Sequence, residues 1–117
     1  MPELFKLVDK KFSEQDKEWQ ATYSCLLNFA FNNREINEIT ITDYYQLKHP
    51  KITNELILSI LQTKLNGARR DPRKKHGKRD IFVEERISYQ GKRYRLVFWF
   101  KDGTTNHLWI RNCHPQD

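Results

Sequence analysis

The feature that most constrains this 117-residue chain is a period of two in the side chains of its last third. Residues 80–89, 93–101 and 105–114 alternate between apolar and polar, as strands with one buried face do. Gln90-Gly91 and Lys101-Asp102-Gly103 separate these segments and have the composition of tight hairpins. We therefore expect an antiparallel three-stranded meander at the C-terminal end of the chain.

Turn length predicts which residues share a face. A two-residue loop at Gln90-Gly91 pairs Ile87 with Tyr94 and Val83 with Phe98, and a three-residue loop at 101–103 pairs Leu96 with Leu108. One face then forms the core, with Glu85 as a misfit; its members are Ile81, Val83, Ile87, Tyr94, Leu96, Phe98, Phe100, Leu108 and Ile110. The opposite face remains open to solvent or ligand and carries Phe82, Glu84, Arg86, Arg95, Val97, Trp99, His107, Trp109 and Arg111.

Helices from the earlier part of the chain are expected to cover the apolar face. Apolar residues recur at helical spacing between Ser13 and Phe31, behind a Ser13-x-x-Asp16 capping pattern, and again over residues 54–66. Residues 36–42 are rich in β-branched side chains, which favours a strand. The predicted fold class is α+β, with helices packed on one face of a curved antiparallel sheet made of the C-terminal meander and one or more N-terminal strands.

The length fits a single domain over residues 1–117. We expect it to comprise an N-terminal helical segment (1–35), a strand and helix (36–66), a basic loop (67–79) and the meander (80–114).

Positive charge is concentrated in the segment before the meander. The chain has 21 Lys and Arg against 15 Asp and Glu, and seven of those cations lie within residues 67–79. Pro72 and Gly77 favour a loop there. The segment is either a solvated charge run or a contact surface for phosphates. Its candidate nucleic-acid contacts are Arg69, Arg70, Arg73, Lys74, Lys75, Lys78 and Arg79.

Arginines and tryptophans are interleaved on the predicted open face. Guanidinium groups bind phosphate in a bidentate manner, and exposed aromatic rings stack on unpaired bases. We therefore take Arg86, Trp99 and Trp109 as further nucleic-acid contacts, with single-stranded RNA favoured over DNA. The alternative is that the two tryptophans cover a second small core under the N-terminal segment.

Catalysis on this face would not need a metal. The histidines and cysteines lack metal-ligand spacing, and no phosphate-binding glycine motif is present, so no metal or other cofactor is expected. RNA supplies its own 2′-hydroxyl as nucleophile, and the protein has to move protons and stabilise a charged phosphorane. The candidates for these roles are His107, Arg95, Arg111, Glu84 and His114.

Cellular location is inferred from what the sequence contains. Cys25 and Cys113 do not form a disulfide framework, and no apolar run approaches the roughly 20 residues of a membrane helix. We expect a cytoplasmic protein without a membrane partner.

The order of elements also resembles a known group of proteins. Residues 39–48 with 52–55, and Tyr94-Arg95-Leu96-Val97-Phe98 with Leu108-Trp109-Ile110-Arg111, resemble segments of RelE-like endoribonuclease toxins and of colicin-type and contact-dependent toxin domains. Several of these families have a His where Tyr44 or Tyr45 falls here. The resemblance implies RNase activity without metal, on mRNA or tRNA, and an acidic antitoxin or immunity protein as partner.

Three functions are therefore kept open. The first is a metal-independent, toxin-like endoribonuclease. The second is a non-catalytic nucleic-acid-binding protein that uses the same face and loop. The third is a protein-interaction module, such as a small inhibitor or regulatory subunit, whose basic surface meets an acidic protein.

Overall fold

Strands dominate the computed structural model, which describes residues 4–26, 28–43 and 51–116. Within these residues one short α-helix continues into a single π-helical segment, and all other regular elements are strands. The elements in chain order are β1 (Phe5–Ser13), β2 (Glu18–Cys25), β3 (Ala30–Phe31), β4 (Arg34–Glu35), β5 (Glu38–Thr42), α1 (Asn54–Ile60), η1 (Leu61–Leu65), β6 (Lys74–His76), β7 (Arg79–Tyr89), β8 (Lys92–Phe100) and β9 (His107–Gln116).

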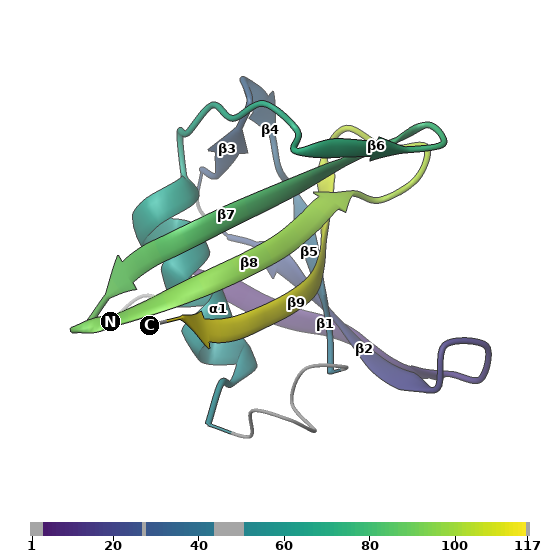
Figure 1. Cartoon of the computed structure of the whole chain (residues 1–117). Helices are drawn as coiled ribbons and strands as arrows, with labels where there is room; N and C mark the ends of the chain where they lie inside the picture. The colour runs from purple at the N-terminus through teal and green to yellow at the C-terminus, as the bar shows by residue number, and fades with distance from the viewer. Residues whose placement is uncertain (1–3, 27, 44–50, 117) are drawn as a thin grey trace.

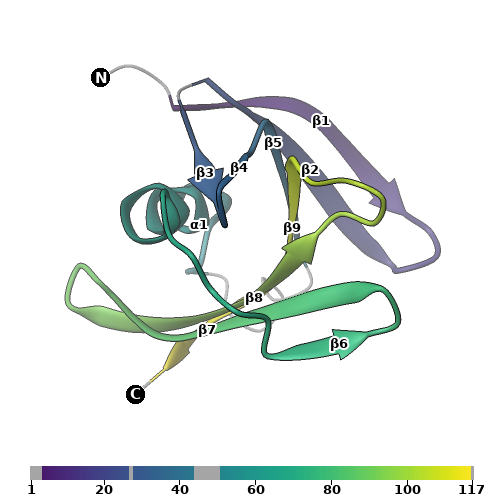
Figure 2. The ribbon, with the colours of Figure 1, turned by 90° about the horizontal axis from the view of Figure 1, so that it is seen from above.

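Seven of the strands form one mixed sheet in the order β1-β2-β5-β9-β8-β7-β6 (Figure 1). Neighbours are antiparallel except β5 and β9, which run parallel. Seen from above, β1 and β2 lie on one side of α1 and β7 and β8 on the other, so the sheet bends around the helix (Figure 2). The expected class, helices packed on an antiparallel sheet, is therefore wrong: the protein is mostly β with a mixed sheet.

The N-terminal segment is a β-hairpin, so the helix expected from Ser13 to Phe31 is wrong. Trp19 and Tyr23 suit helical spacing, but they also alternate with polar residues, and Thr22 of β2 pairs with Thr40 of β5. The Ser13-x-x-Asp16 pattern forms the hairpin turn instead of a helix cap. The Asp16 amide donates to Ser13 Oγ at 3.2 Å, and the Lys17 amide donates to the Ser13 carbonyl at 2.7 Å.

The strand expected at 36–42 and the helix expected at 54–66 are both confirmed. β5 occupies Glu38–Thr42, and α1 with η1 runs from Asn54 to Leu65. Thr53 caps the helix, since its Oγ1 accepts from the Leu56 amide at 3.2 Å. The segment 67–79 is only partly the loop we expected, because β6 within it pairs with the start of β7 through a turn at Gly77, whose φ is +65°.

The meander is confirmed, but its register differs from the expected one. The β7–β8 turn is as predicted, with Tyr89 opposite Lys92 and Ile87 opposite Tyr94. A β-bulge between Glu84 and Ile87 then shifts β7 by one residue, so Phe98 faces Phe82 instead of Val83. Phe82 consequently lies in the core, and its expected place on the open face is wrong.

The β8–β9 connection is longer than the three residues we expected. Phe100 pairs with Leu108, which leaves residues 101–106 between the strands. Leu96 therefore faces Cys113 and not Leu108. The pairing of Phe98 with Ile110 shifts β9 along β8 by an even number of residues from the expected register. Because side chains alternate between the two faces of a strand, an even shift leaves Leu108 and Ile110 pointing into the core.

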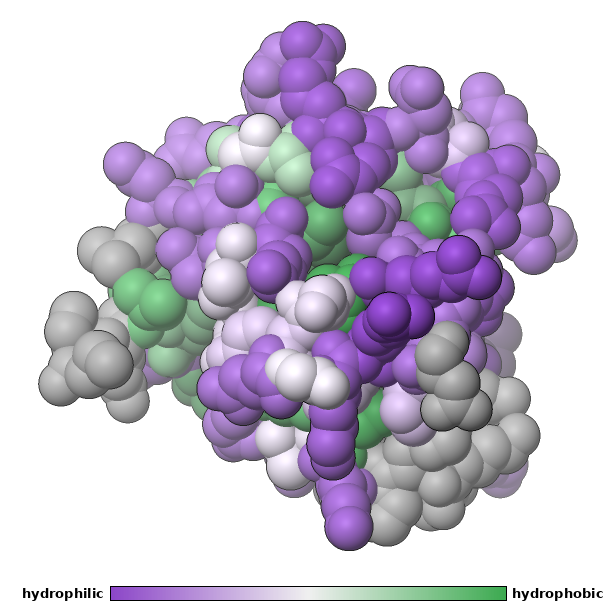
Figure 3. Space-filling model, turned by 60° about the vertical axis from the view of Figure 1, so that its left-hand side comes forward, coloured by the Kyte–Doolittle hydropathy of each residue, from purple (hydrophilic) through white to green (hydrophobic). Residues whose placement is uncertain are grey.

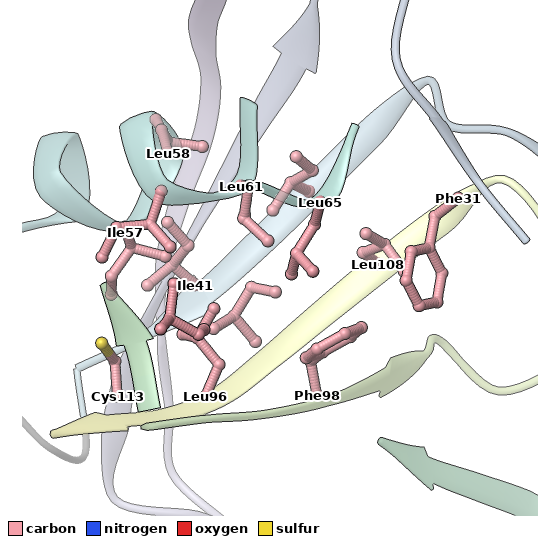
Figure 4. Close-up of a cluster of buried hydrophobic side chains, with 14 of the residues drawn as sticks. Phe31, Ile41, Ile57, Leu58, Leu61, Leu65, Leu96, Phe98, Leu108 and Cys113 are labelled. Carbon is pink, nitrogen blue, oxygen red and sulfur yellow. The ribbon is translucent and has the colours of Figure 1, made fainter. Parts of the chain in front are cut away.

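The core lies between the helix and the sheet (Figure 4). Ile57, Leu61 and Leu65 pack there against Leu96, Phe98 and Leu108, all at most 1% exposed. Phe31, from the β3–β4 hairpin, contacts the rings of Phe82 and Phe98, with centroids 5.2 and 5.3 Å away. With the left side of Figure 1 brought forward, the surface is largely hydrophilic (Figure 3).

Candidate nucleic-acid interface

The face of β8 and β9 that points away from the core is the candidate interface. Arg95, Val97 and Trp99 alternate along β8 with the buried Tyr94, Leu96 and Phe98. Trp109 lies directly opposite Trp99, and His114 lies directly opposite Arg95. The prediction that Arg95, Trp99, Trp109 and Arg111 share one face is therefore confirmed. A bulge in β9 between Ile110 and Asn112 brings His114 onto the same face.

One end of this face holds an acid–base group, which we name the Glu85–Arg95–His114 cluster. Arg95 Nη1 lies 3.3 Å from His114 Nε2, and Arg95 Nε lies 3.4 Å from Glu85 Oε1. Because a guanidinium can only donate, Nε2 of His114 is the acceptor in this contact. Nδ1 then carries the proton and donates to the Pro115 carbonyl at 3.2 Å. These contacts orient the imidazole so that its accepting nitrogen faces Arg95.

Glu85 holds the cluster together electrostatically. Its second oxygen, Oε2, lies 3.3 Å from Arg73 Nη2. The hydrogen bond from Arg73, its charge, and the weaker contribution of Arg95 lower the pKa of Glu85 below its usual range. At neutral pH Glu85 is therefore an anion that fixes two guanidinium groups near His114.

The bulge in β7 explains why Glu85, and not Glu84, contacts Arg95 on the open face. Glu84 faces Leu96 on the α1 side and receives the Arg70 Nε proton at 3.0 Å, so its expected place on the open face is wrong. Glu85 was the misfit in the predicted core. A charged residue that breaks an apolar alternation is itself a signal of a bulge, and that signal could have identified Glu85.

His107 lies at the opposite end of β9 from His114, about 23 Å away at strand spacing. It is 8% exposed, and its Nε2 contacts Thr40 Oγ1 at 2.6 Å; Thr40 in turn contacts Thr22 Oγ1 at 2.8 Å. Burial is the main cause that lowers the pKa of His107, opposed by the Glu38 carboxylate 3.7 Å from Nδ1. The structure does not bring His107 together with Arg95.

The two tryptophans line a cavity of about 480 Å³, the tryptophan pocket, which also includes residues of the β1–β2 turn. Both tryptophans are partly exposed, and residues of the N-terminal segment line the same pocket, so the alternative that they cover a second small core there stays a prediction. The Arg79 guanidinium lies 4.4 Å from the Trp99 ring and forms a bidentate bridge to Asp102, with contacts of 2.7 and 3.1 Å. The Asp102 contact also raises the pKa of Arg79 and lowers that of Asp102.

Arg111 extends into the same pocket and binds a buried carboxylate. Its Nη1 lies 2.5 Å from Oε1 of Glu18, a residue that is 3% exposed. The other oxygen, Glu18 Oε2, is buried and has no hydrogen-bond partner among the residues that the structure describes. Arg111 is therefore anchored to β2, several residues along the sheet from the Glu85–Arg95–His114 cluster.

Many cations of the basic segment are paired with carboxylates. Arg70 binds Glu84, Arg73 binds Glu85, and Lys75 lies 3.7 Å from Asp80. Arg69, Lys74 and Lys78 are exposed and have no ion pair with another described residue. Arg86 is exposed in the β7 bulge, where its backbone amide donates to Gln116 Oε1 at 2.6 Å.

Residues 4–26, 28–43 and 51–116 contain no group of three or more His, Cys, Asp or Glu placed to hold a metal ion. Cys25 and Cys113 are both free thiols, and burial raises the pKa of Cys113 to about 12. No helix in the described part of the chain is long and apolar enough to cross a membrane.

Comparisons of the chain with protein-family models, with curated proteins and with solved structures found no match. The resemblance to RelE-like and colicin-type toxins therefore stays a prediction. Tyr44 and Tyr45, where several of these families have a His, lie outside the described residues.

Proposed function

We propose that this protein binds single-stranded RNA across the open face of β8 and β9 and cleaves it through the RNA's own 2′-hydroxyl. The observation that carries the proposal is the Glu85–Arg95–His114 cluster, where an accepting imidazole nitrogen faces a partly exposed guanidinium. A base for the 2′ proton and a cation for the phosphorane are what this cleavage requires. Trp99 and Trp109 on the same face offer stacking surfaces for unpaired bases.

The proposed reaction begins when Arg95 binds the scissile phosphate. The phosphate competes for the N–H that Arg95 donates to His114, which frees the Nε2 lone pair next to the substrate. Nε2 accepts the proton of the 2′-hydroxyl, O2′ forms a bond to phosphorus, and the bond from phosphorus to the 5′ oxygen breaks. The 5′ oxygen takes a proton from water, so the products are a 2′,3′-cyclic phosphate and a 5′-hydroxyl.

Glu85 has a positioning role in this scheme. Both of its oxygens are held by guanidinium groups, and its pKa is lowered, so it is a weaker base than an unpaired carboxylate. It aligns Arg95 with His114 and keeps Arg73 near the phosphate. The role we expected for Glu84 thus passes to His114 and Glu85.

Incubation of the purified protein with single-stranded RNA in EDTA tests the proposal. We expect cleavage by the wild type and a rate at least ~100-fold lower for His114→Ala and for Arg95→Ala, because each removes a base or a phosphate ligand. Lys64→Ala is the control, since Lys64 is an exposed cation of η1 that lies outside the cluster and outside the face of β8 and β9. Wild-type protein that leaves RNA intact, or full activity in His114→Ala, would contradict the proposal.

The two other functions give different results in the same experiment. A non-catalytic binding protein would retain RNA with a steep salt dependence and leave it uncut. A protein-interaction module would ignore RNA and form a complex with an acidic protein that survives nuclease treatment. The acidic antitoxin or immunity partner implied by the resemblance is tested by the same pull-down.

A further inference from the structure

We propose that a second cavity, where three segments of the chain converge, binds a backbone phosphate of the same RNA at a distance from the cleavage site. The cavity has a volume of about 550 Å³ and lies between β4, the β6–β7 hairpin and the β8–β9 turn. The charged residues that line it, together with His76, define what we call the cationic pocket: Arg34, Lys78, Arg79, Lys101, Asp80 and Asp102. The identity of the ligand rests on the proposed function.

The charge of the pocket favours an anion. Both of its carboxylates already have cationic partners, because Asp102 binds Arg79 at 2.7 Å and Asp80 lies 3.7 Å from Lys75. Arg34, Lys78 and Lys101 are exposed and form no ion pair with another described residue. Three cations from three separate segments are therefore available to one ligand, and a phosphate is the group that such a set binds in RNA.

Arg34 is also oriented for this role. Its guanidinium carbon lies 5.3 Å from the centroid of Phe100, another residue of the pocket wall. A guanidinium that stacks on a ring uses its face for the contact and keeps the N–H groups at its edge for an anion. The ring therefore restrains Arg34 at the pocket without occupying its donors.

The cationic pocket adjoins the tryptophan pocket. Arg79, Lys101 and Asp102 line both cavities, so the Arg79–Asp102 pair forms the boundary between them. Trp99 lies four residues from Arg95 on β8, which is about 13 Å at strand spacing. RNA that reaches from His114 past Trp99 would place a later phosphate in the cationic pocket, several nucleotides from the scissile one.

The test compares two substrates and two charge-matched variants. One variant carries Arg34→Gln, Lys78→Gln and Lys101→Gln; the control carries Lys6→Gln, Lys51→Gln and Lys64→Gln, which lie outside the cationic pocket. The substrates are a dinucleotide, which is too short to reach the pocket, and a dodecanucleotide. Circular dichroism verifies that both variants are folded, and kcat/KM is measured in EDTA.

We expect the pocket variant to cleave the dinucleotide as the wild type does and to lose roughly tenfold in kcat/KM on the dodecanucleotide. The slope of log affinity against log salt, measured on a dodecanucleotide with 2′-deoxyribose, should fall by about 1 in the pocket variant only. Equal loss in the control variant, or no loss in either, would overturn the inference while leaving the proposed function intact.

Failure of the proposed function gives a separate result. If the wild type cleaves neither RNA, the affinity for the deoxy dodecanucleotide still decides the inference. A pocket variant that binds it more weakly than the control supports a phosphate site in a protein that does not cut. Equal affinities for the two variants reject the site.

Discussion

His107 and His114 are both on β9, and their surroundings give them different chemistry. His107 is 8% exposed and contacts the Thr40 hydroxyl at 2.6 Å, so its imidazole belongs to a buried polar network. His114 is partly exposed and faces the Arg95 guanidinium at 3.3 Å. A general base has to reach its substrate, and of these two histidines it is His114 that lies next to a partly exposed guanidinium on the open face.

The buried histidine predicts how stability depends on pH. Burial lowers the pKa of His107 in the folded protein, whereas the unfolded chain keeps the usual value near 6.5. Above that value both states are neutral. As the pH falls through it the unfolded chain binds the extra proton, so folding stability falls until the lower folded pKa is passed. We expect the free energy of unfolding to decrease between about pH 7.5 and pH 5.5.

His107→Gln should remove much of that decrease, because glutamine does not titrate. Urea denaturation of the wild type, His107→Gln and His76→Gln at several pH values measures it. The exposed His76 serves as the control and should leave the wild-type pH dependence unchanged. Parallel curves for wild type and His107→Gln would contradict the role of burial.

Single-residue chemistry was only partly predictable from sequence. Alternation along β8 correctly placed Arg95 and Trp99 away from the core, because a strand's side chains have a strict period of two. The same rule failed at Glu85, since it assumes an unbroken ladder and a bulge adds one residue. The pairing of Arg95 with His114 also depends on a bulge, in β9, which no turn motif announced.

At the level of elements, the bulge in β7 places Glu85 next to Arg95 and so forms the Glu85–Arg95–His114 cluster. Arg86 within it has a φ of +55°, a left-handed conformation that disfavours residues with a Cβ. We expect Arg86→Gly to be more stable than Arg86→Ala by about 1 kcal/mol, because glycine adopts this φ without the steric penalty.

Chemical denaturation of the two variants measures that difference. Both substitutions remove the guanidinium, so the comparison isolates the backbone. The backbone amide of residue 86, which donates to Gln116 Oε1, is present in both. A glycine variant less stable than the alanine variant would show that the bulge does not depend on this conformation.

The N-terminal hairpin shows why some elements were misassigned. Residues 18–25 satisfy helical and strand patterns equally well over a short window, and the choice between them is made by pairing with β5. The β5–β9 parallel pair joins segments that are far apart in the chain, so no local turn signals it. In contrast, helix 54–65 has its own cap at Thr53 and was predictable.

At the level of the whole molecule, the count of basic residues overstates the free positive charge of the segment 67–79. Seven Lys and Arg lie in this segment, but Arg70, Arg73 and Arg79 are each bound to a carboxylate. Three cations that form no ion pair with another described residue, Arg34, Lys78 and Lys101, lie together near the β4, β6–β7 and β8–β9 turns. Such long-range grouping follows from the sheet order, which sequence patterns did not provide.

In the proposed function the protein cleaves RNA through the 2′-hydroxyl with His114 as base. Mass spectrometry of the cleavage products tests this reaction, with a single-stranded RNA and its fully 2′-O-methylated copy, each incubated with wild type and His114→Ala in EDTA. We predict that wild type cuts only the unmodified RNA, leaving 2′,3′-cyclic phosphate and 5′-hydroxyl ends, and that His114→Ala cuts neither. Cleavage of the methylated copy, 5′-phosphate ends, or intact RNA with the wild type would contradict it.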